Sequence, residues 1–202
     1  MAAPHGAVVA RGRRSHAAAT MKTCLTFGAA LAIANALLTF GLYFAGLHSD
    51  VAKLGTAQWV GTTGIIVFSL ACIILGVKAR REEIPADEDF TYGRALGAGV
   101  LVVLFASLLG MITTILYSSV INPGFSELLA QAQVQKWETM GMSAAQIEPA
   151  EKMMRSMMKP PIQAVFGFFS GMVGGTLLSL IVAAFLKRSA LESAEAPPPL
   201  AS

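Results

Sequence analysis

The chain has 202 residues, of which 54% are hydrophobic and only 13% are charged, and its formal net charge is +3. A soluble domain carries about 25% charged residues, so the composition argues against a soluble globular protein. The small net charge gives no indication of nucleic-acid binding. The class that remains is an integral membrane protein.

Four segments contain no Asp, Glu, Lys, Arg or His: Thr23–Leu47, Leu54–Val77, Ala95–Ser126 and Pro160–Leu186. Each is long enough to cross a bilayer, whose core of about 30 Å needs roughly 20 helical residues. We therefore predict an all-α integral membrane protein with four transmembrane helices, at about 23–47, 56–77, 95–120 and 162–186. Because ionisable residues inside a membrane mark most transport and proton pathways, the composition of the spans argues against pumping or catalysis there.

Both ends of the chain are expected to lie outside this membrane domain, which we place at residues 22–188. Residues 1–21 show no periodic pattern, and we expect them to be disordered or to precede a true start at Met21. Residues 189–202 contain Pro197–Pro199, which cannot continue a helix, and we expect a flexible tail. Basic residues are more numerous before span one, between spans two and three, and after span four than in the other two loops. This distribution predicts that both termini are cytoplasmic.

The segment between spans three and four is expected to be helical and extracytoplasmic. Asn122-Pro123-Gly124 should end span three, and a helix should then run from Ser126 to about Met140, where Gly141 breaks it. Ser143 and Gln146 have the spacing of a capping box, although Pro149 could delay or kink the helix that follows.

Four methionines repeat at helical spacing in that second helix, namely Met153, Met154, Met157 and Met158. We favour packing at the membrane interface for this helix. Met-rich surfaces also bind varied partners or copper(I), but the metal is disfavoured because no His or Cys follows Cys72.

Small residues recur at intervals of four along span four, at Gly167, Gly171, Gly175, Ser179 and Ala183. Such a stripe, of the glycine-zipper type, lets two helix backbones approach closely in lipid. Gly28, Ala32 and Ala36 form a shorter stripe on span one, which we consider a suitable partner. Packing within the bundle is favoured over the seam of a homo-oligomer, which stays open as an alternative.

Three short motifs resemble a bacterial family of four-span membrane proteins, the domain of unknown function 4199 family. They are Phe90-Thr-Tyr-Gly-Arg-Ala95 at the entry to span three, Ile121-Asn-Pro-Gly-Phe125 at its exit, and Ser179-Leu-Ile-Val-Ala-Ala-Phe-Leu-Lys187 in span four. The likeness extends over about Lys22–Arg188 and supports a start at Met21. It implies a location in the bacterial inner membrane and the four-span architecture, and it supplies no catalytic residues.

The sequence offers no convincing constellation for catalysis, and we expect no enzyme, cofactor or metal. Ser170 lacks a base at its own depth, and His48 with Asp50 fits an interfacial anchor better than a catalytic pair. The acidic run Asp87–Asp89 fits a solvated loop, and Cys24 and Cys72 fit apolar packing.

Our leading hypothesis is a non-enzymatic membrane protein whose segment Asn122–Lys159 contacts a partner or the membrane surface. The alternative is a small channel or transporter for a neutral or weakly polar solute, lined by groups such as Asn35. Beyond the lipid bilayer, another membrane protein or a second copy are the partners considered, and nucleic acid is not expected.

Overall fold

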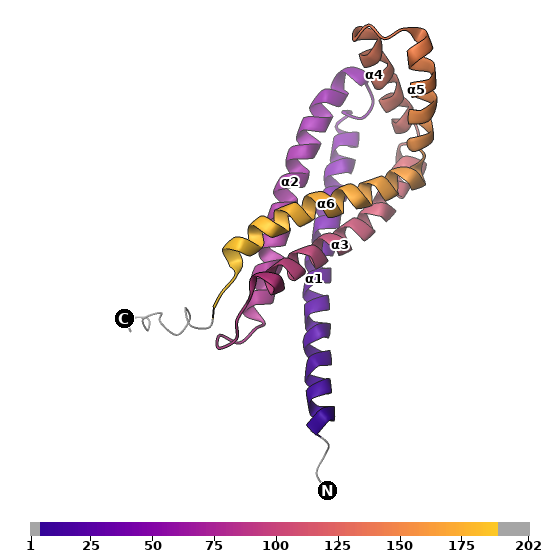
Figure 1. Cartoon of the computed structure of the whole chain (residues 1–202). Helices are drawn as coiled ribbons and strands as arrows, with labels where there is room; N and C mark the ends of the chain where they lie inside the picture. Colours follow the sequence, from indigo (N-terminus) through magenta and orange to yellow (C-terminus); the bar gives the residue numbers. More distant parts are fainter. Residues whose placement is uncertain (1–4, 190–202) are drawn as a thin grey trace. The chain divides into compact units, whose positions relative to one another are not determined.

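The computed structural model describes the backbone of residues 5–189 and the side chains of residues 18–189. It is all-helical (Figure 1). The helices are α1 (His5–Phe44), α2 (Val51–Glu82), α3 (Tyr92–Leu116), a π-helical turn η1 (Tyr117–Ile121), α4 (Phe125–Thr139), α5 (Ala144–Met157) and α6 (Pro160–Leu186).

Four of these segments are long and apolar enough to cross a membrane: Ala18–Phe44, Val51–Glu82, Tyr92–Ile121 and Pro160–Leu186. They confirm the four predicted spans, with ends that shift by a few residues. The second span begins earlier than expected because the Asp50 carboxylate accepts a hydrogen bond from the Ala52 N–H (3.0 Å) at the start of α2. The first helix ends earlier because Gly46 adopts a positive φ of 73°.

Helix α1 begins at His5, whereas the sequence analysis expected residues 1–21 to be disordered. The described backbone of residues 5–21 is helical instead. The physical reason is composition: this stretch is rich in alanine and arginine, which are good helix formers, and no proline follows Pro4 before the apolar span. The tail predicted at 189–202 lies outside the described residues apart from Ser189.

The chain divides into two compact units. Unit 1 comprises the described parts of Met1–Leu31, Ser69–Ala106 and Met172–Ser202, and unit 2 comprises Ala32–Phe68 and Ser107–Gly171. Large apolar side chains on the span helices are extensively exposed, among them Trp59 at 77%, Val173 at 63% and Phe185 at 81%. Such surfaces are not stable in water and are those that lipid covers.

In unit 1, helix α3 packs against three other helices. A Cβ added to Gly28 of α1 would lie 2.8 Å from the Val102 carbonyl oxygen, and one added to Gly76 of α2 would lie 2.8 Å from Val102 Cγ2. On another face of α3, a Cβ on Gly175 of α6 would lie 2.4 Å from Val103 Cγ1. Glycine is therefore required at these crossings so that the backbones can approach.

The end of α6 is tied to the loop between α2 and α3. Phe90 and Arg188 exchange two backbone hydrogen bonds of 2.9 Å, and the Phe90 side chain is fully buried. Arg188 Nη2 also donates to the Pro85 carbonyl oxygen at 2.8 Å. Tyr92 adds a hydrogen bond from its hydroxyl to the Leu180 carbonyl oxygen of α6.

Replacing Gly175 by valine should destabilise the protein, because the new side chain would overlap Val103, a stiff β-branched residue. We expect a loss of about 1–3 kcal/mol in unfolding free energy, measured as a lower midpoint of thermal unfolding in detergent. Gly174→Val is the matched control, since a Cβ at Gly174 meets no atom within 4 Å. Equal midpoints for the two variants would contradict the described crossing.

Candidate functional site

The predicted small-residue stripe of α6 is buried along part of its length. In unit 1, Ser179 and Ala183 are fully buried, and Ser179 lies against Gly99 of α3. In unit 2, a Cβ on Gly171 would lie 2.9 Å from Ser107 Oγ, whereas a Cβ on Gly167 would meet no atom of another element within 4 Å. The nearest neighbours of the stripe are thus residues of α3.

The stripe of α1 has the same neighbour in unit 1. The nearest atoms to Gly28 belong to Val102, Phe105 and Ala106 of α3. In unit 2, Ala32 is buried and Ala36 is half-buried. The two small-residue stripes predict that α1 packs on α6, but the close contacts of Gly28 and of Gly175 are both with α3. The spacing of Gly99 and Ser107, two small residues on one face of α3, was the signal that could have identified α3.

A buried polar and aromatic cluster in unit 2 joins the α1–α2 connection to the base of α4. His48 is 8% exposed, and its Nδ1 lies 2.6 Å from the Tyr117 hydroxyl. Asn122 Nδ2 donates to the same hydroxyl at 3.0 Å. The imidazole also packs on Phe125, the first residue of α4, with ring centroids 4.5 Å apart. These contacts are satisfied when Tyr117 donates to Nδ1 of a neutral His48.

The π-helical turn η1 brings Tyr117 and Asn122 together. The Asn122 N–H bonds to the Tyr117 carbonyl oxygen at 2.8 Å, five residues earlier, which is the π pattern. A π turn has more residues than an α turn, so side chains five apart can lie on one face. The turn coincides with the end of span three at Asn122-Pro123-Gly124, as the sequence predicts.

A second polar network in unit 2 connects η1, α4, α5 and α6. Ser118 Oγ donates to Gln163 Oε1 at 3.3 Å, and Gln163 Nε2 lies 3.5 Å from Ser126 Oγ. Ser126 Oγ in turn donates to the Met158 carbonyl oxygen at 3.3 Å. The two ends of the hairpin formed by α4 and α5 are therefore joined to each other and to α6 at its base.

Helices α4 and α5 lie side by side in this hairpin (Figure 1). Their boundaries match the prediction: Gly141 has a φ of 80°, and the Ser143 N–H donates to Gln146 Oε1 at 3.0 Å in a capping box. Pro149 lies inside α5 without ending it.

An ion pair crosses the hairpin. Arg155 of α5 bonds to both carboxylate oxygens of Glu127 on α4, with Nη2 3.0 Å from Oε1, and its Nε donates to Glu151 at 2.8 Å. The Arg155 guanidinium lowers the pKa of Glu127. The group is exposed, so it fixes the register of the hairpin more than it adds stability.

The four methionines of the predicted helix divide into two pairs. Met154 and Met158 are half-buried on the side of Ile147, the buried residue of α5. Met153 and Met157 are 61% and 43% exposed, and they continue the spacing of exposed Pro149 along the outer face. Met140, at the end of α4, is 68% exposed. The hairpin thus presents flexible apolar side chains on a fixed frame.

The residues considered for catalysis do not come together. His48 bonds to Tyr117, and Asp50 instead receives the Ala52 N–H. Cys24 and Cys72 are free thiols, and Cys24 is buried with its Sγ 3.6 Å from the Ala98 carbonyl oxygen. Among the described residues, no group of three or more His, Cys, Asp or Glu side chains could hold a metal ion.

Four apolar span helices, with a helical hairpin between the third and fourth, define a multi-pass, all-helical membrane protein. Residues 26–188 match the family model described as "Protein of unknown function (DUF4199)", and the chain belongs to this family. The match confirms the resemblance seen in the sequence motifs. Comparison with curated proteins and with solved structures gives no significant match.

Stability should fall as the pH is lowered through the range around 6.5, the ordinary pKa of histidine. Burial lowers the pKa of His48 in the folded protein, so the unfolded chain binds a proton that the folded chain does not. The stabilising effect of neutral His48 is then complete above that range and declines below it. Thermal unfolding in detergent between pH 7.5 and 5 would show the decline.

The control for this prediction is His48→Asn, which removes the titration at this position. We expect the variant to be less stable at pH 7.5 and to lose less stability than the wild type on acidification. A pH dependence that is the same in both proteins would show that His48 is not the group responsible.

Proposed function

We propose that this chain is a non-enzymatic protein of the bacterial inner membrane that uses the outer face of the α4–α5 hairpin to contact a partner protein. Two observations together carry the proposal. The hairpin is fixed near its base by the Ser126–Met158 hydrogen bond and the Glu127–Arg155 ion pair. Met153 and Met157 on its outer face are nevertheless exposed. A fixed frame reduces the entropy lost on binding, and methionine adapts to varied partner surfaces.

A protein partner fits this face better than the outer leaflet of the membrane. The exposed methionines alternate with polar side chains, since Glu148, Lys152 and Ser156 are also exposed. A helix that lies in the lipid interface needs a broad apolar face with bulky residues such as Trp, Phe or Leu. The outer face of α5 has two methionines and a proline instead.

The proposed topology has both termini in the cytoplasm and the hairpin on the other side. It is supported by the basic residues that flank the spans. We further propose that the α6 stripe acts as a glycine zipper within the bundle, supported by the burial of Gly175 and Ser179. A homo-oligomer is the less favoured use of the stripe, and open Gly167 would then be its contact position.

Photo-crosslinking in native membranes tests the partner. A benzophenone amino acid at Met153 of the full chain should give a discrete adduct with one protein, and Met157→Asp should reduce its yield roughly fivefold, because a charge would be desolvated in the contact. The same amino acid at Gln135, an exposed position on α4, is the control and should give no such adduct. Adducts with lipid alone would place the face on the membrane and contradict a protein partner.

One observation favours a second function, a small channel or transporter for a neutral solute. Asn35 in α1 has a buried amide oxygen without a hydrogen-bond partner among the described residues. Inside an apolar span, an unpaired acceptor is costly, and a hydroxyl or amide of a passing solute could satisfy it.

Glycerol uptake into proteoliposomes tests this second function. If the chain conducts glycerol, Asn35→Leu should reduce the rate at least about tenfold, since the acceptor is lost in a site of low polarity. Thr39→Val is the control, because the Thr39 hydroxyl already bonds to the Asn35 carbonyl oxygen of its own helix at 3.0 Å. Absence of protein-dependent uptake in the wild type would exclude glycerol conduction.

A further inference from the structure

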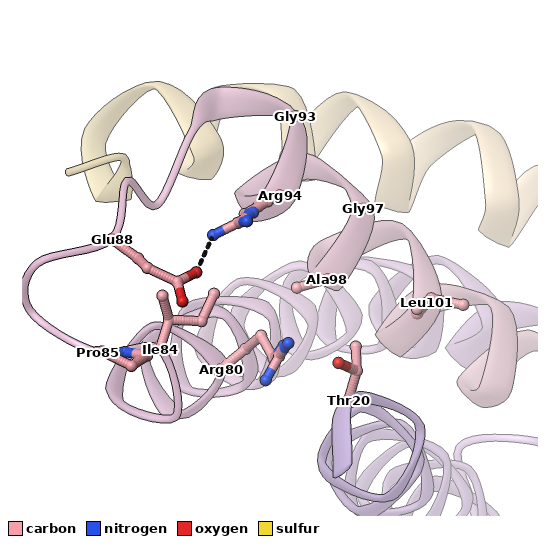
Figure 2. Close-up of a pocket in the computed structure, with 10 residues that line it drawn as sticks. All are labelled: Thr20, Arg80, Ile84, Pro85, Glu88, Gly93, Arg94, Gly97, Ala98 and Leu101. Carbon is pink, nitrogen blue, oxygen red and sulfur yellow. Dashed lines mark hydrogen bonds and ion pairs between the residues drawn. The ribbon is translucent and has the colours of Figure 1, made fainter. Parts of the chain in front are cut away.

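A cavity of about 420 Å³ opens in unit 1 between the ends of three span helices (Figure 2). Its polar lining includes Thr20 of α1, Arg80 near the end of α2 and Arg94 near the start of α3. The corresponding candidate spans begin at Ala18, end at Glu82 and begin at Tyr92. Because consecutive spans alternate in direction, these three ends lie on the same side of the membrane, and the cavity lies at the boundary between its apolar core and water.

Two guanidinium groups border the cavity. Arg80 extends from α2 toward Thr20, and Arg94 extends from α3 toward Glu88 (Figure 2). The Arg80 side chain is only 13% exposed and bonds through Nη1 to Glu83 at 2.6 Å. Arg94 Nη1 donates to the Asp89 carbonyl oxygen at 2.8 Å and to Glu88 at 3.3 Å.

These contacts leave donors for a ligand. A guanidinium carries five N–H donors in a planar fork that suits phosphate oxygens. Within the described part of the chain, the side-chain hydrogen bonds of Arg80 and Arg94 are made by Nη1. The Arg94–Glu88 pair is long and about half exposed, so an anion of greater charge density can compete for it.

The remaining wall is apolar and follows one side of α3 away from the polar end. Gly93, Gly97 and Leu101 succeed one another at intervals of four, with Ala98 beside them (Figure 2). A Cβ added to Gly93 or Gly97 would meet no atom within 4 Å. The backbone is therefore open here without being needed for a helix crossing, which distinguishes Gly97 from Gly99 two residues later.

We propose that this cavity binds a membrane phospholipid, with the headgroup phosphate on Arg80 and Arg94 and the start of an acyl chain along Gly97 and Leu101. The volume falls in the range of small-molecule sites. The sequence of surfaces, cationic at the membrane boundary and apolar toward the core, matches the order of groups in a phospholipid. A soluble phosphate compound would use the arginines and leave the apolar wall without a function.

Part of the cavity wall is formed by the loop between α2 and α3, and Arg188 holds this loop in place. Arg188 Nη2 contacts the carbonyl oxygens of Ile84, Pro85 and Glu88, three residues that line the cavity. The loop that carries Glu88 is consequently fixed by Arg188, two residues after the end of α6, and the distance between the cavity edges does not depend on the exposed ion pair alone.

Native mass spectrometry of the full chain in detergent, titrated with dioleoyl phosphatidylglycerol, tests the proposal. Gly97→Leu should place a side chain in the cavity, since a Cβ at this position meets no atom within 4 Å, and should raise the apparent Kd of the first bound lipid roughly tenfold. Arg94→Gln should weaken lipid binding by a similar factor through loss of a charge-assisted hydrogen bond. Gly110→Leu is the matched control in the same helix, because Gly110 also has open space but does not line the cavity. Arg155→Gln controls for net charge.

Two results would overturn the assignment. Unchanged lipid affinity in both Gly97→Leu and Arg94→Gln, with the thermal unfolding of both variants preserved, would show that lipid binds elsewhere. Displacement of the lipid by millimolar inorganic phosphate, with phosphate binding insensitive to Gly97→Leu, would identify a soluble phosphate ligand instead. Loss of lipid binding in Gly97→Leu and Arg94→Gln, with Gly110→Leu and Arg155→Gln unaffected, is the expected result.

Discussion

Close backbone approach to α3 is the constraint on which the packing of unit 1 depends. Lipid tails are as apolar as leucine, so no hydrophobic force drives span helices together. The helices associate instead through van der Waals contacts between closely packed surfaces. Close approach is made possible by glycines on three different helices, Gly28, Gly76 and Gly175, and by Gly99 on α3 itself. The large side chains that would fill a soluble core face outward instead, as Phe185 does at 81% exposure. The lack of charge in the central parts of the spans is thus compatible with a specific structure.

Polar groups are concentrated where the spans end, and each end uses them differently. In unit 1, arginines and carboxylates surround a cavity beside an apolar wall. In unit 2, His48, Tyr117 and Asn122 satisfy one another within an aromatic cluster and leave the hairpin as the exposed element. A membrane protein whose spans carry ionisable groups only near their ends can therefore still recognise ligands, because the boundary regions hold both the charges and the irregular backbone that recognition needs.

Much of the architecture follows from the sequence because its signals are local. Runs without charge identify the spans, and Gly141 with Ser143 and Gln146 marks the turn and the cap of the hairpin. The parts that could not be predicted depend on contacts between distant residues. A stripe at four-residue spacing identifies the face of a helix but not the helix opposite, which is why α3 was missed as the partner of α6. His48 and Tyr117 are 69 residues apart, and the cavity takes its lining from three helices and a loop. Neither the cluster nor the cavity therefore leaves a pattern in any single segment.

The contact between Phe90 and Arg188 has a consequence for how the protein is made. A chain that enters the membrane in order presents the α2–α3 loop long before Arg188 is synthesised. Until then, the carbonyl oxygens of Ile84, Pro85 and Glu88 lack the guanidinium that holds them, and the Phe90 backbone lacks its partner. Arg188, just after the fourth span, closes the wall that the second and third spans began. Completion of the cavity thus coincides with the end of membrane insertion, and partial chains would be distinguishable from finished ones at this position.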